Sequence, residues 1–173
     1  MKCAIDGCVA NTVGQSKYCG PHRAESRKRW KEMLGNKSAE KQARETKWED
    51  LWCEADAAGK AAAAALYDSG QLQPMVVQQH ANMMDDQSPV VKSYYVPEGP
   101  CGFAWVVVRP GNHSFALWCK KHQKARPNYG GGMMVKWVHE YGQSMQLKEA
   151  YARAFAEVLR GAGINAYSSS RMD

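Results

Sequence analysis

Four side chains of the types that bind zinc in proteins lie within the first twenty-two residues. They are Cys3, Cys8, Cys19 and His22, spaced C-x4-C-x10-C-x2-H. The first pair consists of two thiolates and the second of a thiolate and an imidazole, with ten residues between the pairs. Such a set can bind Zn2+ with tetrahedral geometry. Four protein ligands leave no coordination position for water or substrate. The spacing therefore predicts one structural zinc and not a catalytic one.

The alternatives for these cysteines are a disulfide framework or unrelated buried thiols. The chain opens directly on Met1, Lys2 and Cys3, without an apolar signal segment. That opening favours reduced cysteines and a cytoplasmic protein. No apolar run approaches the roughly eighteen residues that a membrane span requires, so we expect a soluble protein.

A second set of possible metal ligands lies in the C-terminal half. Its members are Cys101, His113, Cys119 and His122, and the last two repeat the C-x2-H spacing of the first set. The same cysteines are also typical of small buried side chains. A third interpretation makes Cys101 an enzymatic nucleophile with His113 or His139 as its base, although no motif for an oxyanion site accompanies it.

Charge divides the chain into three zones. The net charge is +6 over residues 1–48, −6 over 49–100 and +6 over 101–173, and the pI is near 9.0. Basic surfaces at both ends favour an anionic partner, and we expect nucleic acid, with DNA favoured. Solubility charge on an ordinary basic protein is the alternative.

Two clusters of basic side chains are candidates for phosphate contacts. One follows the first ligand set directly, and the other precedes a glycine run at 130–132. We expect sequence-neutral contacts with the backbone of the nucleic acid, because no base-reading motif accompanies either cluster. The alternative is that these basic side chains only lie on solvent-exposed helix faces or complement the dipole at a helix C-terminus. The candidate residues are Arg23, Arg27, Lys28, Arg29, Lys120, Lys121 and Lys124.

The N-terminal residues resemble small zinc modules of phage-encoded proteins, some of them HNH-type endonucleases. The resemblance lies in the C-x4-C pair, the segment Tyr18-Cys19-Gly20-Pro21-His22 and the arginine that follows. It implies a nucleic-acid-related role for the protein. It does not imply nuclease activity, because the chain lacks the block of paired histidines and an asparagine that binds the catalytic metal in that family. Asn112, His113 and His122 are the nearest candidates for such a block.

The C-terminal region is similar to small uncharacterised phage proteins. The similarity rests on residues 100–106, on Tyr141-Gly142-Gln143-Ser144 and on the ending Ser170-Arg171-Met172-Asp173. It implies a viral origin, and with it the cytoplasm of a host cell, but it implies no particular activity.

Helical periodicity covers most of residues 20–68. Gly35 and Asn36 are expected to end a basic helix, so that residues 1–35 form a zinc knuckle with that helix. Ser38 then caps an alanine-rich helix within 36–68 that runs to about Tyr67. Its apolar stripe favours either packing within the chain or pairing of the 38–67 helix with a second copy or another protein. The stripe consists of Ala39, Ala43, Trp48, Leu51, Trp52, Ala55, Ala58, Ala62 and Leu66.

Residues 69–100 lack periodicity and are interpreted as a linker. An α+β domain follows over 101–173, with a possible start near 92. Its expected order is ββαβαβ, with strands at 92–96, 103–108, 133–138 and 164–168. Helices are expected after a cap at Asn112 or Ser114, extending to about Lys124, and after Ser144. Two helices on a small mixed sheet complete the predicted architecture.

These observations favour a non-catalytic, zinc-containing nucleic-acid-binding protein. One alternative is a protein-interaction factor, either an inhibitor of a host enzyme or a virion component, that binds through the long helix. A second alternative is a nuclease or cysteine-dependent enzyme with an unrecognised site.

Overall fold

The computed structural model describes all 173 residues and divides into two compact units, Met1–Lys47 and Trp48–Asp173. Helix α1, Gly20–Asp68, begins in the first unit and ends in the second. None of the helices combines the length and the apolar character that crossing a membrane requires.

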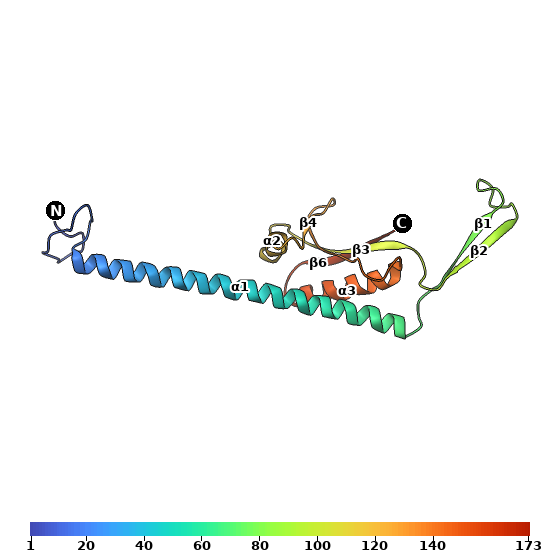
Figure 1. Cartoon of the computed structure of the whole chain (residues 1–173), viewed down its shortest axis with the longest axis horizontal. Coiled ribbons are helices and arrows are strands. Elements are labelled where there is room, and N and C mark those ends of the chain that lie inside the picture. Colours follow the sequence, from blue (N-terminus) through green and yellow to red (C-terminus); the bar gives the residue numbers. More distant parts are fainter. The chain divides into compact units, whose positions relative to one another are not determined.

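Helix α1 is a single helix of 49 residues, drawn without a break in Figure 1. The predicted break at Gly35 and Asn36 is therefore wrong, and so is a separate cap at Ser38. A glycine inside a helix costs only about 1 kcal/mol relative to alanine. The flanking segments are rich in Lys, Glu, Arg and Ala, which favour the helix and offset that cost.

The C-terminal unit contains a four-stranded sheet with two further helices. In chain order its elements are β3 (Gly102–Val108), α2 (Ser114–Lys121), β4 (Arg126–Pro127), β5 (Met133–Trp137), α3 (Met145–Gly161) and β6 (Ala166–Met172). The strands lie in the order β4-β5-β3-β6, and every neighbouring pair is antiparallel. This confirms the α+β class, and the order of elements is that of a split βαβ sandwich.

The strand expected at 92–96 does not join this sheet. It is β2 (Val90–Val96), which pairs only with β1 (Met75–His80) in a separate antiparallel hairpin. The interval 69–100 is thus partly structured and not a plain linker. The four-stranded sheet has the order βαββαβ, because the short strand β4 supplies the missing element, and it is antiparallel where a mixed sheet was expected.

The core lies between one face of the sheet and the helices. Ala104, Val106 and Val108 alternate along β3 and are fully buried, together with Phe155 and Leu159 of α3. Alternation along a strand and a 3.6-residue period along a helix place these side chains on facing surfaces. Ser144 caps α3 as predicted, whereas α2 is capped by His113 and ends at Lys121, earlier than expected.

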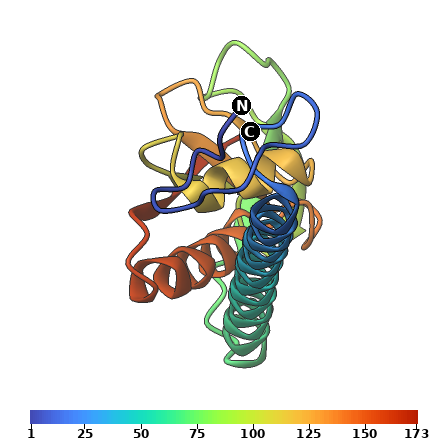
Figure 2. The ribbon, with the colours of Figure 1, turned by 90° about the vertical axis from the view of Figure 1, so that its left-hand side faces the viewer.

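The last part of α1 belongs to this core. Ala55, Gly59 and Ala63 are buried, and the rings of Trp52 and Phe155 lie 6.0 Å apart. Figures 1 and 2 both show this part of α1 beside α3. From Trp48 onward the apolar stripe therefore packs within the chain. The earlier positions, Ala39 and Ala43, are exposed.

Candidate metal centre

The predicted zinc ligands meet at one point in the N-terminal unit. The ligand atoms of Cys3, Cys8, Cys19 and His22 all lie within 4.8 Å of one another. The Sγ atoms of Cys8 and Cys19 are 3.8 Å apart, and His22 Nδ1 lies 3.4 Å from Cys3 Sγ and 3.3 Å from Cys19 Sγ. Tetrahedral bonds of about 2.3 Å to sulfur and about 2.0 Å to nitrogen give edges of about 3.8 and about 3.5 Å. The four side chains are therefore positioned to hold one metal ion.

Short backbone contacts bring the two halves of this site together. Cys3 N donates to Ala10 O at 3.1 Å, and Ala4 N donates to Lys17 O at 2.9 Å. Gly7 has a φ of 78°, a left-handed conformation that permits the turn before Cys8. The N-terminal loop depends on few backbone hydrogen bonds, so a bound ion would supply much of its stability.

Helix α1 begins within the ligand set, directly after Cys19. Arg23 N donates to Cys19 O at 2.8 Å, so the third ligand closes the first turn of the helix and His22 lies within that turn. The N-terminus of a helix carries a partial positive charge that favours thiolates. Metal binding and the start of α1 are therefore coupled through Cys19.

Hydrogen bonding also favours an ionised Cys3. The backbone N–H of Cys19, 3.4 Å from Cys3 Sγ, and then that of Ile5 lower the pKa of Cys3 to about 6. At Cys8 the N–H of Ala10 favours the thiolate, but burial and the neighbouring thiols outweigh it and raise the pKa. A divalent cation at the centre would relieve that repulsion between thiolates.

The basic residues after the ligands lie on the first turns of α1. Arg27, Lys28 and Arg29 are exposed, and Arg23 is half-buried. Arg29 is paired with Glu25 at 2.5 Å, one helical turn away. Arg27 and Lys28 take no part in that ion pair and are therefore the side chains of this cluster most accessible to a ligand.

The second predicted basic cluster lies at the end of α2. Lys120 and Lys121 occupy its last turn and are exposed. Lys124 is more enclosed, because its Nζ lies 3.5 Å from a Glu49 carboxylate oxygen and 3.8 Å from the centre of the Trp52 ring.

The second set of possible metal ligands is not assembled. The N-terminal four are the one group of three or more Cys, His, Asp and Glu side chains close enough to share an ion. Cys119 is fully buried, and burial raises the pKa of its thiol to about 12. His113 Nδ1 accepts a hydrogen bond from Phe115 N at 3.2 Å, and His122 lies against the Trp118 ring. Cys101 forms a backbone bridge with Ser144 at the start of β3.

No protein-family model, curated protein or solved structure matches this chain. Its function is therefore argued from the geometry of its own residues.

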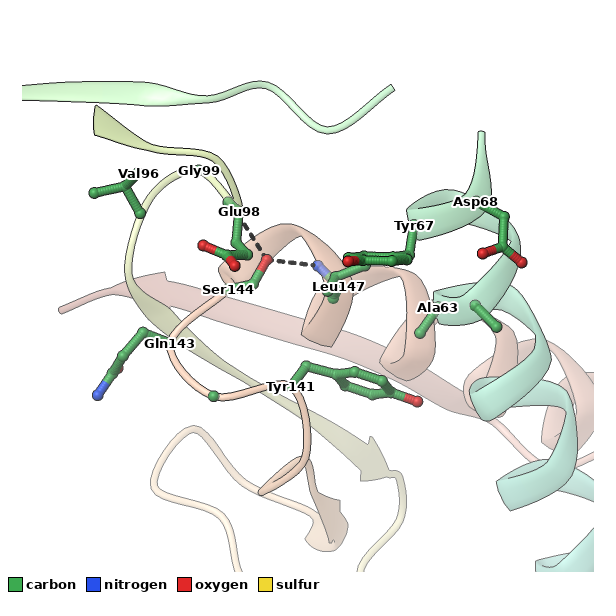
Figure 3. A pocket seen from close by; sticks show the side chains of 12 residues that line it. Ala63, Tyr67, Asp68, Val96, Glu98, Gly99, Tyr141, Gln143, Ser144 and Leu147 are labelled. Atoms are coloured by element: carbon green, nitrogen blue, oxygen red, sulfur yellow. Dashed lines mark hydrogen bonds between the residues drawn. The ribbon is translucent and has the colours of Figure 1, made fainter. Parts of the chain in front are cut away.

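The C-terminal unit also contains a pocket of about 610 Å3 that the sequence did not predict (Figure 3). Tyr67 and Tyr141 flank it, and Ser144 Oγ at its floor donates to Glu98 O at 2.8 Å. Its wall is mainly apolar, and its charged side chains are the acidic Asp68 and Glu98. These charges disfavour a phosphate ligand. The sequence carried no signal for this pocket, because its walls come from three separate segments, residues 63–68, 96–99 and 141–147.

Proposed function

We propose that this chain is a zinc-containing, non-catalytic nucleic-acid-binding protein. In this proposal the N-terminal metal is a structural zinc that fixes the start of α1, and the basic first turns of α1 contact phosphates. The observation that carries it is the closed set of four ligands joined through Cys19 to an exposed basic helix.

The ligand chemistry supports zinc. Three thiolates and one imidazole form a soft donor set that suits tetrahedral Zn2+, and the spacings between ligand atoms agree with such an ion. Four protein donors fill the tetrahedron. An ion held in this way stabilises the fold and has no position for a reacting water.

The distribution of charge supports a phosphate partner. Arg27 and Lys28 are exposed on the first turns of α1, and in this proposal the metal holds the start of that helix in position. Their charges are therefore held at fixed positions relative to the metal site. Lys120 and Lys121 offer a further basic site in the C-terminal unit. Contacts of this kind bind any sequence and weaken as salt concentration rises, because counterions are released on binding.

The test is a fluorescence anisotropy titration of labelled duplex and single-stranded DNA at several salt concentrations. Arg27→Ala and Lys28→Ala should each weaken binding of every sequence alike and reduce the salt slope by about 1. Arg153→Ala removes the same charge from an exposed position on α3 and serves as the control. A wild-type protein without measurable affinity for either form of DNA would contradict the proposal.

A protein-interaction role is the second candidate function. Trp30, Met33 and Leu34 lie three and four residues apart on α1, and all three side chains are exposed. Such spacing places them on one helix face, which suits an apolar groove on another protein or a second copy of this helix. Binding through this face should resist salt, and Trp30→Ala should abolish it, whereas Arg27→Ala should not.

A further inference from the structure

One face of the four-stranded sheet carries no helix. α3 packs against β3 and β6, and α2 packs against β5, on the face that presents Ala104 and Val106. In Figure 1, α3 and the last part of α1 lie on the same side of β3 and β6. The alternation along β3 sends Phe103 and Trp105 to the opposite face, whereas Val107, which follows them on that side, is fully buried. We call this helix-free surface the open sheet face.

Large aromatic rings occupy the centre of the open sheet face. Trp105 on β3 is directly opposite Trp137 on β5, with ring centres 5.4 Å apart and planes inclined by 7°. The Phe103 ring lies 5.5 Å from the Trp137 ring. β3 and β5 are the two inner strands, so these three rings form one cluster at mid-sheet. Each ring is half-buried, because the rings lie against one another and against the side chains of Arg126, Arg171 and Lys148.

Two arginine side chains lie against the aromatic cluster, and a third lies further along the sheet. The guanidinium carbon of Arg126 on β4 lies 5.1 Å from the Trp137 ring, and that of Arg171 on β6 lies 5.6 Å from the Phe103 ring. Arg109, which follows β3, lies 5.1 Å from the Tyr167 ring. The four strands contain no Asp or Glu. An apolar surface with a cationic border and no acidic side chain complements a ligand that has both aromatic rings and negative charges.

A pocket lies at the edge of the open sheet face. β4 pairs with β5 only at Met133 and Met134, so the later residues of β5 have no neighbouring strand on that side. A pocket of about 330 Å3 lies there, lined by Arg126, Trp137 and His139 among others, with no acidic side chain in its wall. Its size is at the lower end of the range for small-ligand pockets. A flat base stacked on the aromatic cluster would have room at this edge.

We infer that the open sheet face binds single-stranded nucleic acid by stacking bases on Trp105, Trp137 and Phe103, while Arg126, Arg109 and Arg171 contact the phosphates. This inference rests on the proposed nucleic-acid-binding function and adds to it the form of the ligand and a second binding surface. Bases in a single strand are free to stack on aromatic side chains, whereas those in a duplex already stack on one another. Four-stranded sheets with aromatic side chains on their inner strands are used in this way for RNA.

The test compares labelled single-stranded DNA, single-stranded RNA and duplex DNA, each titrated with the full-length, zinc-loaded protein. Trp137→Leu and Trp105→Leu remove an aromatic face but keep apolar bulk. Each should weaken single-strand binding about tenfold or more and leave the salt slope unchanged, because stacking releases no counterions. Trp137→Phe should restore most of the affinity. Tyr95→Leu, which removes an exposed aromatic ring from the β1-β2 hairpin, is the matched control.

Arg126→Ala provides a second test that does not disturb the core, because this side chain is exposed on the edge strand. It should weaken single-strand binding and lower the salt slope. Single-strand affinity that both Trp→Leu variants leave unchanged, while Arg27→Ala weakens it, would overturn the role of the sheet and leave the proposed function standing. A wild-type protein that binds neither strand form would overturn both proposals.

Discussion

The hydroxyl of Tyr151 on α3 donates a hydrogen bond to the carboxylate of Asp56 on α1. Asp56 also accepts from Lys136 of β5 at 3.2 Å and pairs with Lys60 at 2.6 Å. Lys136 in turn donates to Glu140 at 2.9 Å. This network joins α1, α3 and β5 around a fully buried ring. It therefore fixes the last part of α1 on the sheet domain.

Replacing Asp56 by Asn should destabilise the C-terminal unit. Asn can still accept from Tyr151, but it removes the negative charge that Lys136 faces in a largely buried position. We expect a loss of about 1–3 kcal/mol in the free energy of unfolding. Urea denaturation followed by circular dichroism measures it. Asp50→Asn, at an exposed position on the same helix, is the control and should leave stability unchanged.

The same network should make stability fall in acid. Burial opposes ionisation of Asp56, but hydrogen bonds from Lys60, Tyr151 and Lys136 outweigh it and lower the pKa below its ordinary value of 3.8. A lowered pKa in the folded state contributes stability above the ordinary pKa, and this stability disappears as pH falls through the folded-state value. Glu140, whose pKa is also lowered through Lys136, adds to the effect.

Denaturation series between neutral pH and about pH 3 would test this linkage. The wild type should lose stability more steeply below about pH 4 than Asp56→Asn does. Parallel curves for the two proteins would mean that Asp56 does not contribute to the acid response.

The close contact between α1 and α3 depends on the absence of a side chain at Gly59. A Cβ atom there would lie 2.8 Å from the Tyr151 ring, which is fully buried. Gly59→Ala should therefore destabilise the unit by about 1–3 kcal/mol, although alanine favours the helix. At Gly35, on the same helix, an added Cβ meets no atom within 4 Å. Gly35→Ala should raise helix content or thermal stability, and opposite signs for the two variants are the expected result.

The elements that could be predicted from the sequence are those set by local signals. Ser144 as a cap and the periodic stripe of the following residues predicted α3, and the continuous apolar run at 103–108 predicted β3. The ligand spacing predicted the metal site because both knuckles are short segments of chain. Each of these signals lies within one element and does not depend on its partner.

The features that escaped prediction depend on partners distant in sequence. Val90–Val96 has a strand pattern, but the pattern does not reveal whether it pairs with β1 or with the main sheet. A break at Gly35 was predicted because the free-energy cost of a glycine in a helix was considered alone. The helix-favouring residues on both sides of Gly35 offset that cost and were not weighed against it. The aromatic cluster was invisible because Trp105 and Trp137 meet only through strand pairing.

Metal content provides the last prediction. The wild type should carry one zinc per chain by elemental analysis, and Cys19→Ser should lose it, because this ligand lies at the centre of the site and closes the first turn of α1. Cys53→Ser, at an exposed position elsewhere on α1, should retain the zinc. Two zincs per chain would contradict a single site, and loss of the second zinc in Cys119→Ser would then assign it to the set Cys101, His113, Cys119 and His122.

Removal of the metal should have a local effect. The N-terminal loop has few backbone hydrogen bonds of its own, whereas α3 and the sheet have a buried core that contains no metal ligand from this site. Chelation should therefore accelerate amide exchange in residues 1–19 and in the first turn of α1, and leave α3 protected. Lowering the pH should release the ion in the same way, since protons compete for the thiolates. Loss of protection throughout α3 after chelation would instead mean that the metal supports the whole fold.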